Sequence, residues 1–306
     1  MIISVDHGNK SIKTPHTMFT SGLIESGAKL TGSDYIFWGG KYYTLTERRI
    51  TYMRDKTEDD RFYILTLFAV ARELEHAGIK ESEEPVDITL LIGLPPAHYA
   101  QLHSRFEQYI LRRREPVEFE YNGRIYTIRI KQVVSYIQAL AAAVTRFGDL
   151  KKYPASYIID IGGFTVDVLK LRYGKPDLAV MESFEQGTIT LYNSIISQCN
   201  SQYAMLLEEC DIDEVIKGEP SILPGEVQVM IRTMSDQFLN EFYRTMRERG
   251  IDVATAKCVF TGGGSLLLRS MVERSRKVGF PIFIEDIHAN AIGYEFLYRS
   301  EVIARG

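Results

Sequence analysis

The 306-residue sequence has few cysteines and no excess of charge of either sign. Its three cysteines, Cys199, Cys210 and Cys258, form no Cys-x-x-Cys pair, so neither a disulfide framework nor a zinc site is expected, and a reducing cytosol fits. The 36 lysines and arginines stand against 40 acidic residues, which argues against direct binding of a nucleic acid backbone. No stretch approaches about 18 uninterrupted apolar residues and no signal-peptide pattern opens the chain, so neither export nor membrane insertion is expected.

The composition, with 45% hydrophobic and 25% charged residues, is that of an ordinary globular protein. The length is about twice that of a typical domain, which favours two domains or one large one. Strand and helix patterns alternate along the chain, and this alternation predicts an α/β fold. The expected strands cover residues 1–6, 87–94, 156–160, 164–171, 179–184, 258–261 and 282–285. Between 118 and 130, Asn122-Gly123 separates alternating apolar residues and predicts an antiparallel hairpin.

Helices are predicted by apolar residues that recur at steps of three and four. One such series is Val133, Ile137, Leu140, Val144 and Phe147, and a second is Val227, Ile231, Met234, Phe238 and Phe242. Further helices are expected near 58–77, 97–113, 188–199, 204–217, 265–277 and 289–303.

Two segments half a chain length apart resemble each other. Residues 2–8 (Ile-Ile-Ser-Val-Asp-His-Gly) and 157–163 (Tyr-Ile-Ile-Asp-Ile-Gly-Gly) both run from a buried strand into Asp-x-Gly and then into a second strand-like segment. The turn-rich stretch 148–154 lies between them and is the best internal boundary. This spacing favours duplicated domains.

The first of these segments carries groups suited to phosphate. Asp6 stands at a strand end, Gly8 and Asn9 form a tight turn, and Lys13 follows on the return strand. Backbone amides and an ammonium suit phosphate oxygens, and the carboxylate suits a hydrated Mg²⁺. The alternative is an ordinary hairpin in which glycine supplies the positive φ.

The second segment repeats the arrangement with two glycines and a hydroxyl. Asp160 is followed by Gly162, Gly163, Phe164 and Thr165, and the alternating residues beyond them indicate a strand. A strand at this place separates the loop from the strand-to-helix loops of Rossmann and Walker proteins.

A third glycine cluster, Gly262, Gly263 and Gly264, joins a strand to a helix that opens with Ser265. Consecutive glycines permit a nucleotide to lie against the backbone at a helix N-terminus. A flexible strand-to-helix turn is the alternative.

These three loops, in this order, resemble the nucleotide site of the actin, sugar kinase and heat-shock chaperone ATPase superfamily. The resemblance implies two duplicated actin-like (ribonuclease H-like) domains with mixed sheets flanking a nucleotide cleft. It places domain I at 1–154, with a small subdomain near 14–55 and the C-terminal helix 289–306 packed back on it, and domain II at 155–288. It assigns the phosphates to the first two loops together with Gly187, and the adenosine to the third loop.

The form of the second loop and the chain length most resemble the ParM/StbA group of bacterial plasmid segregation actins. Gln138, in a segment similar to the first connecting helix of actin-like proteins, falls where actins place the glutamine that orients the attacking water. The resemblance implies that Asp6 and Asp160 hold Mg²⁺ mainly through water. It also implies a bacterial cytoplasmic ATPase that binds ATP and ADP, forms filaments of itself, and contacts DNA only through an adaptor of the ParR type.

Three other functions stay open at this point. A non-segregation actin-like cytoskeletal protein would share every motif above. A small-molecule kinase of the same superfamily would need a substrate-facing catalytic aspartate, and none can be assigned from the sequence. A non-polymerising nucleotide switch would bind ATP without assembling.

Overall fold

The computed structural model describes residues 1–51, 53, 55–112 and 114–305. The chain divides into two compact units, of which unit 1 contains Met1–Val144 with His288–Gly306 and unit 2 contains Thr145–Ile287. The division comes earlier than the expected boundary after residue 154. The backbone N–H of Tyr173 donates to the carbonyl of Tyr153 at 3.1 Å, which ties the stretch before 154 to unit 2.

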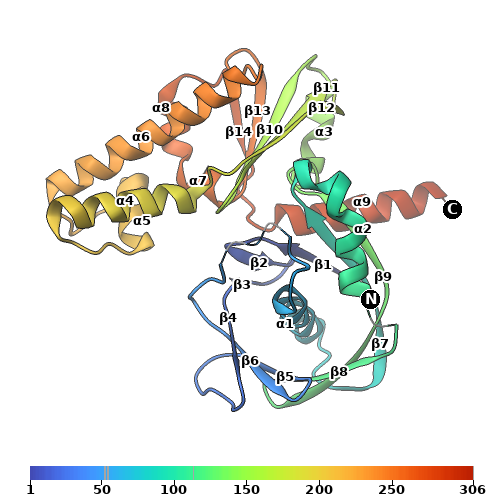
Figure 1. The fold of residues 1–306 in the computed structure, drawn as a ribbon. Helices are drawn as coiled ribbons and strands as arrows, with labels where there is room; N and C mark the ends of the chain where they lie inside the picture. The colour runs from blue at the N-terminus through green and yellow to red at the C-terminus, as the bar shows by residue number, and fades with distance from the viewer. Residues whose placement is uncertain (52, 54, 113, 306) are drawn as a thin grey trace. The chain divides into compact units, whose positions relative to one another are not determined.

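Unit 1 is built on a nine-stranded mixed sheet in the order β3-β2-β1-β7-β9-β8-β5-β6-β4 (Figure 1). Its strands are β1 (Ile2–His7), β2 (Ser11–Lys13), β3 (Met18–Thr20), β4 (Leu23–Ser26), β5 (Tyr35–Trp38), β6 (Lys41–Leu45), β7 (Ser82–Leu94), β8 (Val117–Tyr121) and β9 (Arg124–Ile137). The central strands β1, β7 and β9 are parallel, and the others pair antiparallel. Residues 14–55, expected as a small subdomain, contribute strands to this same sheet.

Three helices pack on the sheet of unit 1, namely α1 (Arg61–His76), α2 (Pro96–Leu111) and α9 (Ala289–Arg305). Every residue of helix α1 from Phe62 to Ala71 is buried, and Thr66 is the one aliphatic polar residue among these apolar and aromatic side chains. A helix that is apolar on all sides requires cover on all sides. Figure 1 shows the curled sheet around α1, which provides that cover.

Unit 2 has a five-stranded sheet in the order β12-β11-β10-β13-β14. Its strands are β10 (Ser156–Ile161), β11 (Val166–Arg172), β12 (Lys175–Phe184), β13 (Lys257–Thr261) and β14 (Phe280–Phe283). Its helices are the 3-10 turn η1 (Val144–Arg146, which begins at the last residue of unit 1), α3 (Phe147–Leu150), α4 (Thr188–Tyr203), α5 (Glu209–Lys217), α6 (Gly225–Glu248), α7 (Gly263–Leu267) and α8 (Arg269–Ser275). Among the described residues, no helix is both long and apolar enough to cross a bilayer.

The hairpin predicted at Asn122-Gly123 is confirmed. It joins β8 to β9, and both turn residues have positive φ, 51° and 86°. Such a turn matches the right-handed twist of the flanking strands.

The helix predicted from Val133 to Phe147 is wrong. Strand β9 continues to Ile137 in parallel pairing with β7, and residues 138–143 form a turn. Residues four positions apart lie on the same face of a strand and also on the same face of a helix. The spacing of Val133 and Ile137 therefore fits both structures. Long-range pairing with β7 decides between them in favour of the strand.

The internal repeat predicted from the sequence appears in the strand pairing. In unit 1, β1 pairs antiparallel with β2 on one side and parallel with β7 on the other. In unit 2, β10 has the same two neighbours in β11 and β13. Each unit therefore presents an Asp-bearing strand that turns into a hairpin, and it does so from the same place in its sheet.

Candidate functional site

The carboxylate of Asp6 is the centre of a buried hydrogen-bond network in unit 1. Asp6 lies near the end of β1 and is 5% exposed. The amide nitrogen of Gln138 donates to its Oδ1 at 2.6 Å, and the amide nitrogen of Asn290 donates to its Oδ2 at 3.4 Å. The carboxylate thus accepts hydrogen bonds from two neutral donors, and these bonds fix its orientation.

Gln138 reaches Asp6 from the turn that follows β9. Its backbone N–H donates to the carbonyl of Leu94 at 2.9 Å, which extends the β7–β9 pairing by one residue. Ala139 follows with a φ of 63°, and its N–H donates to Oδ1 of Asn290 at 3.0 Å. Gln138 is 7% exposed, so it is a buried residue rather than a solvated flank residue.

Close packing of α9 places Asn290 in this network. A Cβ on Gly293 would lie 2.0 Å from the carbonyl oxygen of Ala141, and a Cβ on Gly93 would lie 1.9 Å from the hydroxyl of Tyr294. At Gly293 the neighbouring atom belongs to the backbone, so only glycine permits this approach. The helix therefore lies directly against the 138–143 turn and against β7.

The first hairpin turns at residues 8–10. A Cβ on Gly8 would meet the carbonyl oxygen of Ser11 at 2.5 Å, so the turn itself requires glycine. Lys13 stands opposite Asp6 in the β1–β2 register. The side-chain oxygen of Asn9 is buried and accepts no hydrogen bond within the described part of the chain. This oxygen is an unsatisfied acceptor, and buried acceptors in proteins are usually hydrogen-bonded.

His7 and Lys56 support the hairpin from inside the core. His7 is fully buried with its Nε2 2.7 Å from the hydroxyl of Thr66. Burial, together with the nearby charge of Lys56, lowers the pKa of His7 to about 3, so the ring is neutral. The buried ammonium of Lys56 donates to the carbonyl of His7. No local pattern in the sequence singles out Lys56.

The second loop, in unit 2, is held by the start of α4. Asp160 is 7% exposed and pairs with Asp167 across the β10–β11 hairpin. The N–H groups of Gly187, Thr188 and Ile189 donate to carbonyls of residues 164, 162 and 163, at 2.9, 3.1 and 2.8 Å. The N–H of Gly187 therefore holds the loop. The hydroxyl of Thr165 donates to Asp167 at 3.3 Å.

The three glycines of the third loop have different roles. Gly262 has a φ of 87°, and a Cβ there would lie 2.2 Å from Oδ1 of Asp160. A Cβ on Gly264 would lie 2.5 Å from the side chain of Ile161. A Cβ on Gly263 meets nothing within 4 Å. Two of the glycines thus serve packing against the second loop, and the third faces open space.

The structure thus brings the selected residues together in two groups, one in each unit. Asp6, Gln138 and the Gly8 turn belong to unit 1, and Asp160, the 162–165 loop and the 262–264 loop belong to unit 2. Within the described residues, no group of three or more His, Cys, Asp or Glu side chains has the arrangement to hold a metal ion.

The chain is similar to known proteins in sequence over part of its length and in structure over nearly all of it. Residues 5–140, which include Asp6 and Gln138, match the family profile described as Actin like proteins N terminal domain. No curated protein sequence matches the chain.

Three solved structures illustrate the structural similarity. Ta0583, an archaeal actin homolog, in complex with ADP has a TM-score of 0.74 at 17% identity, covering 98% of this chain and 99% of that one. The apo psk41 ParM protein has a TM-score of 0.70 at 15% identity, with 99% and 98% covered. The Alp12 filament structure has a TM-score of 0.66 at 14% identity, with 100% and 99% covered. With its two mixed sheets and paired Asp-bearing hairpins, the chain has an actin-like fold.

Proposed function

We propose that this protein binds ATP through the hairpin loops of both units, hydrolyses it, and assembles into filaments of itself. The observation that carries the proposal is the repeated hairpin. Each unit holds one nearly buried aspartate, Asp6 or Asp160, at the end of a central strand and beside a glycine turn. The ADP complex of the archaeal actin homolog and the Alp12 filament support nucleotide binding and self-assembly for a chain of this fold.

Each unit on its own offers groups whose chemistry suits a hydrated Mg²⁺ or a phosphate. Asp6 and Asp160 would hold the ion through its water ligands, and Lys13, opposite Asp6 in the β1–β2 register, would neutralise phosphate charge. The unsatisfied oxygen of Asn9 would take a donor from this hydration shell. Bound Mg²⁺ supplies charge stabilisation for phosphoryl transfer. The open face of Gly263 would accommodate the adenosine.

Gln138 would orient the attacking water molecule in this proposal. Its amide nitrogen is engaged by Asp6, which fixes the side chain and assigns the amide oxygen as its remaining acceptor. A fixed acceptor that orders the attacking water contributes through positioning, which is what phosphoryl transfer chiefly needs. The proposal therefore gives Gln138 and Asp6 one joint role.

We propose further that the filaments move plasmid DNA through a DNA-binding adaptor of the ParR type. The similarity to the psk41 ParM protein supports this role. The formal net charge of −4 supports an adaptor rather than direct contact with DNA. A cytoskeletal role without plasmid segregation is the alternative within the same fold.

High-speed sedimentation with ATP, with ADP and without nucleotide, combined with phosphate release, tests this proposal. We expect the protein to pellet with Mg-ATP, to release phosphate as it does so, and to stay in the supernatant without nucleotide. A protein that stays monomeric at tens of micromolar while it phosphorylates a sugar or acid would establish the kinase alternative instead. A protein that binds ATP but neither pellets nor transfers phosphate would be a nucleotide switch.

A further inference from the structure

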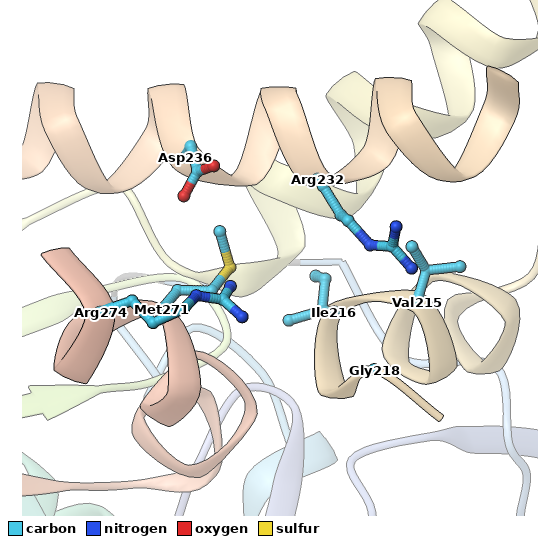
Figure 2. Close-up of a pocket in the computed structure, with 7 residues that line it drawn as sticks. All are labelled: Val215, Ile216, Gly218, Arg232, Asp236, Met271 and Arg274. Carbon is cyan, nitrogen blue, oxygen red and sulfur yellow. The ribbon is translucent and has the colours of Figure 1, made fainter. Parts of the chain in front are cut away.

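Unit 2 contains a pocket that the proposed nucleotide site does not use. It has a volume of about 420 Å³ and lies between α5, α6 and α8 (Figure 2). Val215, Ile216 and Met271 line it and are at most 4% exposed. The volume falls within the range of pockets that hold a ligand or a large side chain. Three apolar and three charged residues thus share the lining, which suits a ligand that has both an apolar and a charged part.

The rim of the pocket is cationic. Arg232 comes from α6 and Arg274 from α8, and Figure 2 shows both side chains extended toward α5. Arg232 donates to the side chain of Gln228 at 3.3 Å. Within the described part of the chain neither arginine has a carboxylate at ion-pair distance, although Arg249 and Arg269 of the same unit are both paired. Asp236 also lines the rim and leaves it with one net positive charge.

Exposed apolar side chains lie beside the pocket along the chain. Val229, one turn before Arg232 on α6, is 60% exposed. Ile222 is 98% exposed and belongs to the connection between α5 and α6, which begins at the pocket-lining Gly218. Val229, three residues before the pocket-lining Arg232, adds exposed apolar area on the same helix, and together with the apolar lining residues it favours a peptide over a small free anion as the occupant.

We propose that this pocket docks an acidic segment of a partner protein, in which one apolar side chain is flanked by glutamates or aspartates. The apolar side chain enters between Ile216 and Met271, and carboxylates on either side pair with Arg232 and Arg274. Guanidinium groups bind carboxylates through two parallel hydrogen bonds, so the two arginines select acidic over basic flanks. No residue that lines the pocket is among those proposed to bind the nucleotide.

Fluorescence anisotropy with a small set of labelled peptides tests the proposal on the full chain. Each peptide has a central Leu, Ile, Met or Phe with two glutamates on each side, and matched peptides carry lysines instead. We expect at least one acidic peptide to bind, the lysine peptides not to bind, and added salt to weaken the complex. Absence of binding by every acidic peptide, or equal binding of the lysine peptides, would overturn the proposal.

Charge reversal locates the site. Combined Arg232→Glu and Arg274→Glu should weaken peptide binding by about tenfold or more, because loss of one charge-assisted contact already corresponds to about 1.4 kcal/mol. Arg244→Glu, an exposed position on α6 that does not line the pocket, is the matched control and should change binding less than about twofold. An equal loss in the control would refute the location. ATP-dependent sedimentation should persist in the double variant, and its loss with peptide binding intact would assign the surface to a second copy of this chain.

Discussion

Replacing Gln138 by glutamate tests the network around Asp6 with almost no change of shape. The substitution exchanges the amide that donates to Asp6 at 2.6 Å for a second carboxyl. At neutral pH the change removes a hydrogen bond to a charged acceptor, worth about 1.5–3 kcal/mol, and brings two buried carboxylates together. We expect the Gln138→Glu variant to lose about 3 kcal/mol or more of unfolding free energy at pH 7.

The same variant should recover stability in acid. Repulsion raises the pKa of the introduced carboxyl above that of a free glutamate, so the folded state holds a proton that the unfolded chain has lost. Stability from this proton is present at low pH and disappears as pH rises through the raised pKa. Between pH 5 and pH 7 one such proton changes the unfolding free energy by at most about 2.7 kcal/mol. When protonated, the carboxyl can again donate to Asp6.

Urea denaturation followed by tryptophan fluorescence measures this effect in unit 1. The chain has one tryptophan, Trp38, which packs against Tyr63 in the core of that unit. Gln132→Glu, on the exposed side of β9, is the control and should change stability by less than about 0.5 kcal/mol at either pH. If Gln138→Glu matches this control at both pH values, Gln138 does not support Asp6 and the reasoning is refuted.

Four further outcomes follow from the same structure. Gly262→Ala should destabilise unit 2 because its Cβ would overlap the Asp160 carboxylate, whereas Gly263→Ala should fold normally and weaken ATP binding, as circular dichroism and ATP titration would show. Asp160→Ala should reduce both ATP binding and sedimentation, whereas Gln138→Ala should slow phosphate release by roughly ten- to a thousandfold and leave longer-lived filaments. Acidification from pH 7 to pH 5 should lower the stability of unit 1 by about 2 kcal/mol, because neutral His7, with its pKa of about 3, resists a proton that the unfolded chain binds. The purified protein should not bind duplex DNA tightly at physiological salt, which a filter or anisotropy assay would check.

Local patterns predicted much of the fold. The Asn122-Gly123 turn and the strands that begin each repeat follow from residues that are neighbours in sequence. The short strands between residues 18 and 45 were not predicted, because each is three to five residues long and depends on its partners in the sheet. The incorrect prediction of a helix at 133–147 has the same cause. Pairing between β7 and β9 determines the structure there, and the helical spacing of the apolar residues does not.

Local patterns in the sequence indicate only some of the contacts around Asp6 and Asp160, because most of these contacts join residues that are distant in sequence. Asp6 and Asp160 carried a local signal in their Asp-x-Gly turns, and Gln138 was selected by family resemblance alone. Asn290, which donates to Asp6 across 284 positions, had no local signal, since an asparagine at a helix start usually acts as a cap. The close approach of Gly293 to Ala141 creates this contact, and only the folded chain reveals it.

Calorimetric titration with Mg-ATP tests the central claim most directly. We predict that each chain binds one ATP, that chelation of Mg²⁺ abolishes binding, and that either Asp6→Asn or Asp160→Asn weakens it strongly. Each substitution keeps the size of the side chain, removes its charge and replaces one acceptor oxygen by an NH2 donor. Two ATP molecules per chain, or undiminished binding when either aspartate is replaced, would contradict a nucleotide site built from the hairpins of both units.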